Sequence, residues 1–534
     1  MYNNFKPDTN ESCISRGICS ISPEITALQE VMFVMLRGLA FYVIKLELLG
    51  AKNEQIKQDM IKNIMYLSTL REYTEEQVHF IVNTLFSNFI NTEKIYRNLC
   101  VQNGSTFDKF NSPIKFENNM DMNRLISEGD KVYKNKFKSL EPAIKNSAEI
   151  LFCILKSLTF PLIELIEYKI DNTKAIRAII KAVNLYNQNN ITEEKIRANI
   201  YDLADLNAEL MGELEQIKIK NFGKIRSIEV SCSTEKGKAI LVSGNSMAEL
   251  EEVLKYTQDA DVNVYTNGSL LIAHSYTDFS RYSNLKGHFG NGVETSVLDF
   301  ATFPGAILLT KNEAHNVEYL YRGRIFTTES IPPKGVAKIS SGKLELLTKA
   351  AFEAKGFTKG QKRNSVKIGF DLDEVEQNFQ EIADKLVDNT FRRLYIIGFS
   401  NTGSATGEYF KNFFAQKEEN EAVISFSYNA KCDNIYTINI ANDYTLAIML
   451  MNKLFDKIPA DSDKLTFFLT RCDSSAFAAM VRLNHKGAKS IYMSSCQPNI
   501  MNPVTLAAFR DLYNIKEMTT AGNDLENIRK TETE

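Results

Sequence analysis

The sequence predicts a multidomain α and α/β protein, with an N-terminal all-α helix-bundle domain followed by two open Rossmann-like α/β domains. Two observations predict it. Up to about residue 218, apolar residues recur at three- and four-residue spacing with almost no strand signal, which is typical of packed helices. Beyond that point, 238–266 and 392–428 each show the order strand, turn, helix, strand. Such units imply mostly parallel sheets with helices on their faces.

The helical part contains seven segments with this spacing, and two of them begin with a clear cap. Thr74 and Thr192 are each followed by two glutamates, so a capping hydroxyl precedes carboxylates in the positively charged first turn. The predicted helical segments are 24–49, 54–68, 74–98, 120–137, 140–170, 173–188 and 192–217.

Loop-like breakers at 329–343 and 355–367 separate the two α/β units. We therefore predict domains at 1–218, 219–365 and 366–534. Ligands of open parallel sheets bind at the carboxyl ends of the strands, so the chemistry is expected in the loops that follow them. The predicted strands end near Val242, Val264, Leu309, Ile397, Ser427 and Ile440.

The composition is that of an ordinary globular chain of 534 residues, with a formal net charge of -3. This slightly negative charge gives no electrostatic indication of nucleic-acid binding. The most apolar stretch, 31–49, is interrupted by Arg37, Lys45 and Glu47, so we expect no membrane span. Eight scattered cysteines and an N-terminus without an export signal favour free thiols in a reducing cytoplasm.

Two cysteines, Cys13 and Cys19, lie just ahead of a Ser-Pro-Glu helix start at 22–24. Proteins often anchor a metal cluster in such a place, but a cluster held by four thiolates needs two more cysteines. The segment that precedes them contains none.

Several stretches, in order along the chain, carry a resemblance to a known family. They are SCISRGICSISPEITALQEV, VSGNSMAELEEVL, NVYTNGSLLIAHSY, DFATFPGAILLT and GRIFTT, together with the layout of 396–443. The chain resembles the hybrid-cluster proteins, also called prismane proteins or hydroxylamine reductases, from residue 2 to about 515. The carbon monoxide dehydrogenases share this architecture, but the local sequence motifs are closer to those of the hybrid-cluster branch. The resemblance implies two iron–sulfur centres and redox chemistry on small nitrogen species.

The first of these centres is a cubane cluster that the family holds with a C-x2-C…C-x5-C arrangement. Cys13 and Cys19 match the second pair, and the first pair falls at Tyr2 and Phe5. Phenylalanine has no lone pair, and a phenol is a poor ligand for a soft metal site. The resemblance therefore implies that half of the cubane ligands have been replaced.

The second centre is the hybrid cluster, which the family holds with a histidine, two glutamates and four cysteines, one of them a persulfide. All seven positions carry other residues here, and none is a cysteine. In family order they are Asn245 for the histidine, Ser269 for the first glutamate, Glu313, Ser400, Tyr428 and Ala441 for the cysteines, and Asp473 for the second glutamate. Because cluster assembly depends on cysteinate sulfur, we predict that the hybrid cluster is lost.

Other residues near these positions offer weaker metal sites. The isolated cysteines Cys432, Cys472 and Cys496 are expected to behave as small buried hydrophobes or inert thiols rather than as a relocated cluster site. His274 and His288 could join carboxylates in binding a harder cation. The carboxylates that could join them are Glu313 and Asp473. For both histidines, however, we favour a structural role in which backbone contacts satisfy the ring.

Three functions follow from these patterns. The favoured hypothesis is a degenerate, non-catalytic homologue that acts as a binding or scaffold protein for an unidentified protein partner and carries no cofactor. The first alternative is an iron–sulfur oxidoreductase acting on hydroxylamine or nitric oxide. The second is a homodimer that shares one 4Fe-4S cluster through Cys13 and Cys19, as the related carbon monoxide dehydrogenases do.

Overall fold

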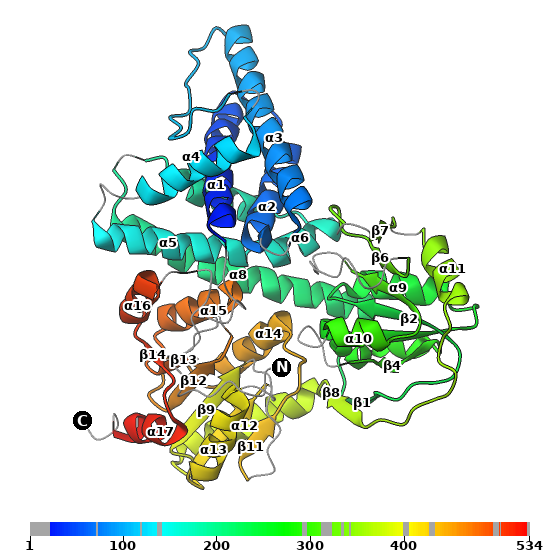
Figure 1. Ribbon diagram of the computed structural model, residues 1–534. Helices are drawn as coiled ribbons and strands as arrows, with labels where there is room; N and C mark the ends of the chain where they lie inside the picture. Colours follow the sequence, from blue (N-terminus) through cyan, green and yellow to red (C-terminus); the bar gives the residue numbers. More distant parts are fainter. Residues whose placement is uncertain are drawn as a thin grey trace.

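The computed structural model of the chain describes residues 22–70, 73–117, 120–135, 141–188, 190–290, 296–310, 323–332, 336–340, 343–398, 405–426, 433–471, 473–494, 501 and 503–530. It contains a helical region and two separate parallel sheets (Figure 1). This arrangement confirms the predicted fold class. The long helix α8 (Glu193–Phe222) packs against helices of the helical region and against helices of the second α/β region. It therefore lies at the interface between these regions (Figure 1).

The helical region is built around α1, which is buried along most of its length. Ser22 caps α1 and Pro23 occupies its first turn, where the missing N–H of a proline costs nothing. Gly129 on α4 lies so close to α1 that an added Cβ would sit 2.1 Å from the carbonyl oxygen of Ala27. The other helices of this region are α2 (Glu54–Thr69), α3 (Glu75–Gln102), α4 (Met122–Asn135), α5 (Pro142–Ser157), α6 (Thr159–Glu167) and α7 (Thr173–Leu185).

The helical segment predicted at 140–170 is wrong as a single element, because the structure divides it into α5 and α6. Pro161 stands in the first turn of α6 and has no N–H to donate to the carbonyl four residues earlier. That carbonyl belongs to Ser157, and it accepts a hydrogen bond from Asn207 Nδ2 on α8 at 2.8 Å instead. The break therefore joins α5 to α8.

The first sheet is entirely parallel, with the strand order β4-β3-β2-β5-β6-β7. The chain starts at the centre with β2, moves out on one side, and returns to place β5 on the other side of β2. Its strands are β2 (Lys238–Ser243), β3 (Val262–Asn267), β4 (Leu285–His288), β5 (Ala306–Leu309), β6 (Ile325–Thr327) and β7 (Ala337–Lys338). Its helices are α9 (Met247–Tyr256), the 3-10 helices η2 (Gly268–Ser275) and η3 (Thr277–Arg281), α10 (Ser296–Thr302) and α11 (Glu345–Glu353).

The second sheet repeats this plan, with the parallel order β11-β10-β9-β12-β13-β14. Here the chain turns back between β9 and β12. The strands are β9 (Arg393–Gly398), β10 (Glu421–Ser425), β11 (Ile435–Thr437), β12 (Leu465–Leu469), β13 (Ile491–Met493) and β14 (Ile515–Glu517). The helices are α12 (Leu372–Val387), α13 (Ala405–Gln416), α14 (Tyr444–Phe455), α15 (Ser474–His485), α16 (Pro503–Leu512) and α17 (Ala521–Lys530).

A short antiparallel ribbon joins β1 (Ile228–Ser231), which precedes the first sheet in the chain, to β8 (Ser365–Ile368), which follows it. It pairs the two segments that flank the first sheet, and the predicted boundaries near 218 and 366 stay predictions. Within the described ranges, no helix has the length and apolar character needed to cross a lipid bilayer.

Candidate functional site at the carboxyl ends of the strands

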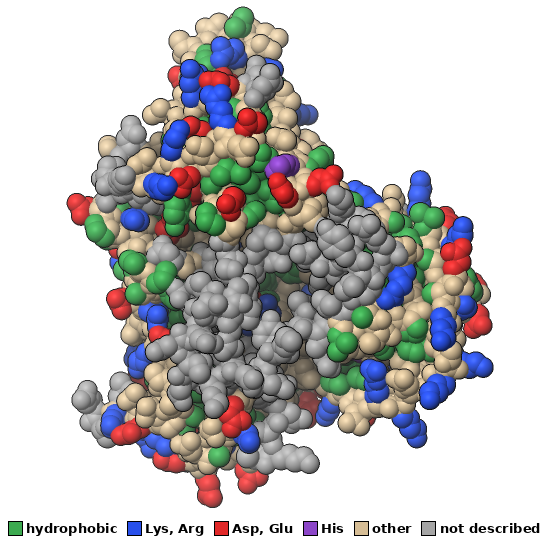
Figure 2. Space-filling view, in the orientation of Figure 1, with side chains coloured by type: hydrophobic (Ala, Val, Ile, Leu, Met, Phe, Trp, Pro, Cys, Tyr) green, Lys and Arg blue, Asp and Glu red, His purple; other side chains and the backbone are tan. Residues whose placement is uncertain are grey.

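The strand order of each sheet reverses at one point, the topological switch point. In open α/β sheets, ligands bind at this switch point, outside the carboxyl ends of the strands. The switch falls between β2 and β5 in the first sheet and between β9 and β12 in the second. Asn245 follows β2 and Asp473 follows β12, so two of the predicted site residues lie at these switch points. Figure 2 shows that the surface is hollowed near the place where the three regions meet.

Asn245 lies in the turn between β2 and α9, and the neighbouring strand end fixes its backbone. The N–H groups of Asn245 and Ser246 both point to Thr310 Oγ1, at 3.1 and 3.4 Å, and Thr310 comes directly after β5. The side-chain oxygen Oδ1 of Asn245 is buried and has no hydrogen-bond partner among the described residues. A buried acceptor without a partner is uncommon, so within the described ranges this turn presents one polar atom that makes no hydrogen bond.

Ser269 lies one strand further out, in the first turn of η2 after β3. Its side chain is exposed. Gly268 before it has a φ of 65°, which glycine adopts without strain. A Cβ built on Gly268 would come within 3.9 Å of the backbone of Gly244, so the loops after β2 and β3 lie side by side.

Ala441 lies in the turn between β11 and α14, where it and Asn442 both have positive φ values of 50° and 62°. Its side chain is a methyl group that packs partly against the core and offers no donor atom. Asp443, two residues after Ala441, caps α14 through its carboxylate.

Asp473 caps α15, and both of its carboxylate oxygens are engaged. Oδ1 accepts from the N–H of Ala476 at 3.0 Å and from the hydroxyl of Tyr444 at 2.8 Å. Oδ2 pairs with Arg471 at 2.8 Å, and the Arg471 guanidinium lies over the Tyr444 ring. Asp473 therefore joins α14 to α15. No residue pattern indicated its partners Tyr444 and Arg471, which come from a separate helix and from the segment after β12.

The remaining predicted site residues lie outside the described part of the chain. They are Tyr2, Phe5, Cys13, Cys19, Glu313, Ser400 and Tyr428, together with Cys432, Cys472 and Cys496. Their assignments stay predictions. The strands that precede Glu313, Ser400 and Tyr428 are described, and they end at Leu309, Gly398 and Ser425.

His274 and His288 share one hydroxyl at the end of β3. His274 Nε2 and His288 Nδ1 each lie 2.9 Å from Thr266 Oγ1. Burial lowers the pKa of His274 to about 3, with help from His288, and burial lowers the pKa of His288 to about 4. Both rings are thus neutral at pH 7, and one accepts the Thr266 proton while the other donates an N–H. Among the described residues no group of three or more His, Cys, Asp or Glu side chains could hold a metal ion.

Beneath these loops, a buried ionic network was not predicted from the sequence. Lys218 Nζ on α8 lies 3.1 Å from Asp443 Oδ2 at the start of α14, and Glu215 on α8 accepts from the hydroxyl of Tyr276, 2.7 Å away, just after η2. The residues come from three separate parts of the chain. In the sequence, Glu215 and Lys218 look like any charged pair on a helix, because their burial depends on both α/β regions.

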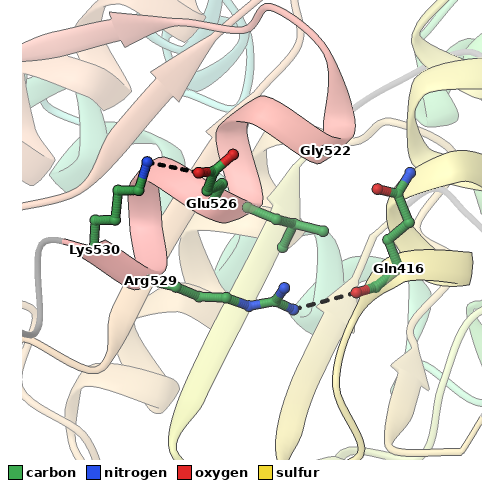
Figure 3. A pocket seen from close by; sticks show the side chains of 6 residues that line it. Gln416, Gly522, Glu526, Arg529 and Lys530 are labelled. Atoms are coloured by element: carbon green, nitrogen blue, oxygen red, sulfur yellow. Dashed lines mark hydrogen bonds and ion pairs between the residues drawn. The ribbon is translucent and has the colours of Figure 1, made fainter.

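A pocket on the outer surface lies at the opposite edge of the second sheet. Gln416 ends α13, and its neighbours in the pocket come from α17: Gly522, Leu525, Glu526, Arg529 and Lys530. Figure 3 shows Lys530 paired with Glu526, and Arg529 bonded to the carbonyl oxygen of Gln416. Since α13 runs back from the strand ends, this pocket is at the amino edge of the sheet, and its charges satisfy one another.

Four of the seven predicted ligand positions are described, and all lie after strands of the two parallel sheets. Asn245 supplies a carboxamide, Ser269 a hydroxyl, Ala441 a methyl group and Asp473 a helix-capping carboxylate. This combination of an all-α region and two parallel-sheet regions defines a multidomain α and α/β protein. The chain belongs to the Prismane/CO dehydrogenase family, whose sequence model matches residues 8–427.

Curated relatives match nearly the whole chain. The hydroxylamine reductase of Methanocella arvoryzae is 22% identical over 534 residues, covering 97% of each chain. The hydroxylamine reductase of Thermodesulfovibrio yellowstonii is 24% identical over 547 residues, covering 97% of this chain and 98% of its own. That of Zymomonas mobilis is 22% identical over 543 residues, covering 97% and 96%. The predicted resemblance to hydroxylamine reductases is confirmed.

Proposed function

We propose that this chain is a member of the family that holds no hybrid cluster and acts by binding another protein rather than by redox catalysis. The observation that carries this proposal is the set of side chains at the seven predicted ligand positions. None of the seven is a cysteine, whereas iron–sulfur clusters are held mainly by cysteine thiolates.

The described residues fit an iron–sulfur cluster poorly. Ala441 has no side-chain donor, and Asn245 and Ser269 offer neutral oxygens of the kind that suit hard cations. The carboxylate of Asp473 is already used by a helix cap, a tyrosine and an arginine. These four positions therefore do not provide the thiolate ligands that catalysis by an iron–sulfur cluster requires.

The same residues support an alternative use of the space. Polar side chains near the strand ends can bond one another, ordered water or a polar ligand. The Oδ1 of Asn245, which has no partner among the residues that the structure describes, is one acceptor for this. The activity that the relatives' names carry resides in a cofactor, for which a protein supplies position and tuning. A shared fold does not by itself transfer such an activity.

The proposal predicts that the purified protein does not reduce hydroxylamine. Protein prepared without oxygen is mixed with hydroxylamine and a reduced viologen dye, and dye oxidation is followed at several protein concentrations. The hydroxylamine reductase of Thermodesulfovibrio yellowstonii is the positive control. We expect a rate equal to that of dye and hydroxylamine alone.

Turnover that rises in proportion to the protein concentration would contradict the proposal and restore the oxidoreductase alternative. In that case, loss of turnover in Cys13→Ser would assign it to a cluster shared between two subunits through Cys13 and Cys19. Turnover unaffected by Cys13→Ser would place the redox centre elsewhere in the chain.

A further inference from the structure

The hydroxyl of Thr445 lies at the centre of the buried network under the candidate site. Its oxygen Oγ1 is 2.9 Å from Lys218 Nζ, 2.6 Å from Glu215 Oε2 and 2.6 Å from Asp443 Oδ1. Lys218 and Glu215 belong to α8, whereas Asp443 and Thr445 belong to the start of α14. Three short contacts thus converge on one hydroxyl.

Counting hydrogens shows that this geometry needs one proton more than ordinary ionisation provides. Lys218 can only donate, so Thr445 accepts from it and has a single hydrogen left to give. If both carboxylates were ionised, one of the two 2.6 Å contacts would join bare oxygens with no hydrogen between them. A proton on either carboxylate removes this repulsion, because that carboxyl then donates to Thr445.

The partners of each carboxylate indicate which one is protonated. Asp443 accepts from the backbone N–H groups of Thr445 and Leu446, at 2.8 and 3.1 Å, and pairs with Lys218 at 3.1 Å. Glu215 is fully buried, and Lys218 Nζ is 3.9 Å from it. Asp443 therefore has more hydrogen-bond and charge partners than Glu215, which favours a proton on Glu215.

We propose that Glu215 carries a structural proton, which closes a hydrogen-bonded chain between α8, the turn after η2 and the start of α14. In this chain Tyr276 donates to Glu215 Oε1 at 2.7 Å, Glu215 Oε2–H donates to Thr445, and Thr445 donates to Asp443. Loss of the proton leaves a second negative charge buried beside Asp443. The joint between the helical region and the two α/β regions is thus sensitive to pH.

The groups that face Glu215 decide the direction of this effect. They are Lys218 on the same helix, Asp443 at the start of α14 and Tyr276 after η2. Glu164 on α6 acts at longer range, through its electrostatic interaction with Lys218 and Tyr276. Burial raises the pKa of Glu215 to about 7, against the opposing attraction of Lys218. For Asp443, burial acts in the same direction, but Lys218 and its hydrogen-bond donors outweigh it and lower the pKa.

Because the folded-state pKa is raised from 4.5 to about 7, the folded protein holds one extra proton within this window. The resulting stabilisation is fully present below about pH 4.5 and is lost as the pH rises through about 7. Between these limits, the ratio of folded to unfolded protein should fall about tenfold per pH unit because of this group alone.

The variant Glu215→Gln tests the proposal, because the amide can donate to Thr445 and accept from Tyr276 without titrating. Urea unfolding of the full chain is measured at several pH values from 5 to 7. We expect the ratio of folded to unfolded protein to fall with rising pH more steeply in the wild type than in the variant, by about a factor of ten per pH unit. The control Glu213→Gln changes an exposed carboxylate on the same helix and should follow the wild type. Parallel pH profiles for wild type and Glu215→Gln would overturn the proposal.

Infrared spectroscopy of the wild type tests the proton directly, even if the variant does not fold. A protonated carboxylic acid has a C=O stretching band separate from that of a carboxylate. We expect this band at pH 5.5 and its loss as the pH rises through about 7. A spectrum with no carboxylic-acid band between about pH 5.5 and 6.5 would overturn the proposal.

Discussion

Lys218→Met is expected to lower the free energy of unfolding by about 3–5 kcal/mol. The ammonium group of Lys218 is buried and pairs with Asp443, and it also donates to Thr445. Methionine keeps most of the side-chain volume but removes the charge, so the carboxylate of Asp443 is left buried without its cation. Breaking a buried pair from one side costs more than removing both charges together. Urea unfolding at pH 6 measures the effect.

Two further variants separate the loss of charge from the loss of packing. Lys220→Met changes an exposed lysine on the same helix and should alter stability by no more than about 0.5 kcal/mol. The double variant Lys218→Met with Asp443→Asn removes both charges while keeping a capping side chain, and it should be more stable than Lys218→Met alone. A Lys218→Met protein within about 1 kcal/mol of the wild type would contradict the assignment of this network as the joint.

Phe468→Ala is expected to cost about 3–5 kcal/mol of unfolding free energy. Phe468 is fully buried near the carboxyl end of β12, and its ring contacts rings on both neighbouring strands and on α13. These rings belong to Tyr395, Tyr409, Phe410, Phe413 and Tyr492. Truncation leaves a cavity that rigid aromatic neighbours fill poorly, so the cost of the cavity adds to the lost burial.

The same substitution at an exposed site provides the control. Phe80 on α3 keeps 59% of its surface exposed, and Phe80→Ala should change stability by less than about 0.5 kcal/mol. Thermal and urea unfolding of both variants compare the two sites. Since β12 leads directly to Asp473, the Phe468 cluster also fixes where this strand end lies. Equal stabilities for the two variants would show that the aromatic cluster does not hold the second sheet together.

Much of the fold was predictable, because its signals are local. The capping threonines at 74 and 192 start α3 and α8 as predicted, and each accepts a hydrogen bond from its helix's first turn. The apolar strand runs placed the ends of β2 and β5 within one residue. The division of 140–170 was missed because Pro161 alone does not show whether the helix continues, bends or ends there. The break depends on Asn207, a distant residue that donates a hydrogen bond to the carbonyl of Ser157.

The candidate site was predictable only in part. Asn245, Ser269, Ala441 and Asp473 each follow a strand in the structure, whereas their assignment as former ligand positions stays a prediction. The sequence did not reveal what those side chains do. The role of Asp473 depends on Tyr444 and Arg471, and the burial of Glu215 and Lys218 depends on elements more than 50 residues away in the chain. Such properties arise from packing between regions, which residue patterns do not encode locally.

The central claim, that this family member holds no hybrid cluster, is tested most directly by its iron and acid-labile sulfide content. Both are measured per chain on protein purified without oxygen, together with a visible spectrum and a thermal melt. The account predicts near-zero iron and sulfide in a colourless protein that melts cooperatively. About two irons per chain, abolished by Cys13→Ser, would instead indicate a cubane cluster shared by two subunits. About six or more irons per chain would contradict the account and restore the cluster-bearing enzyme.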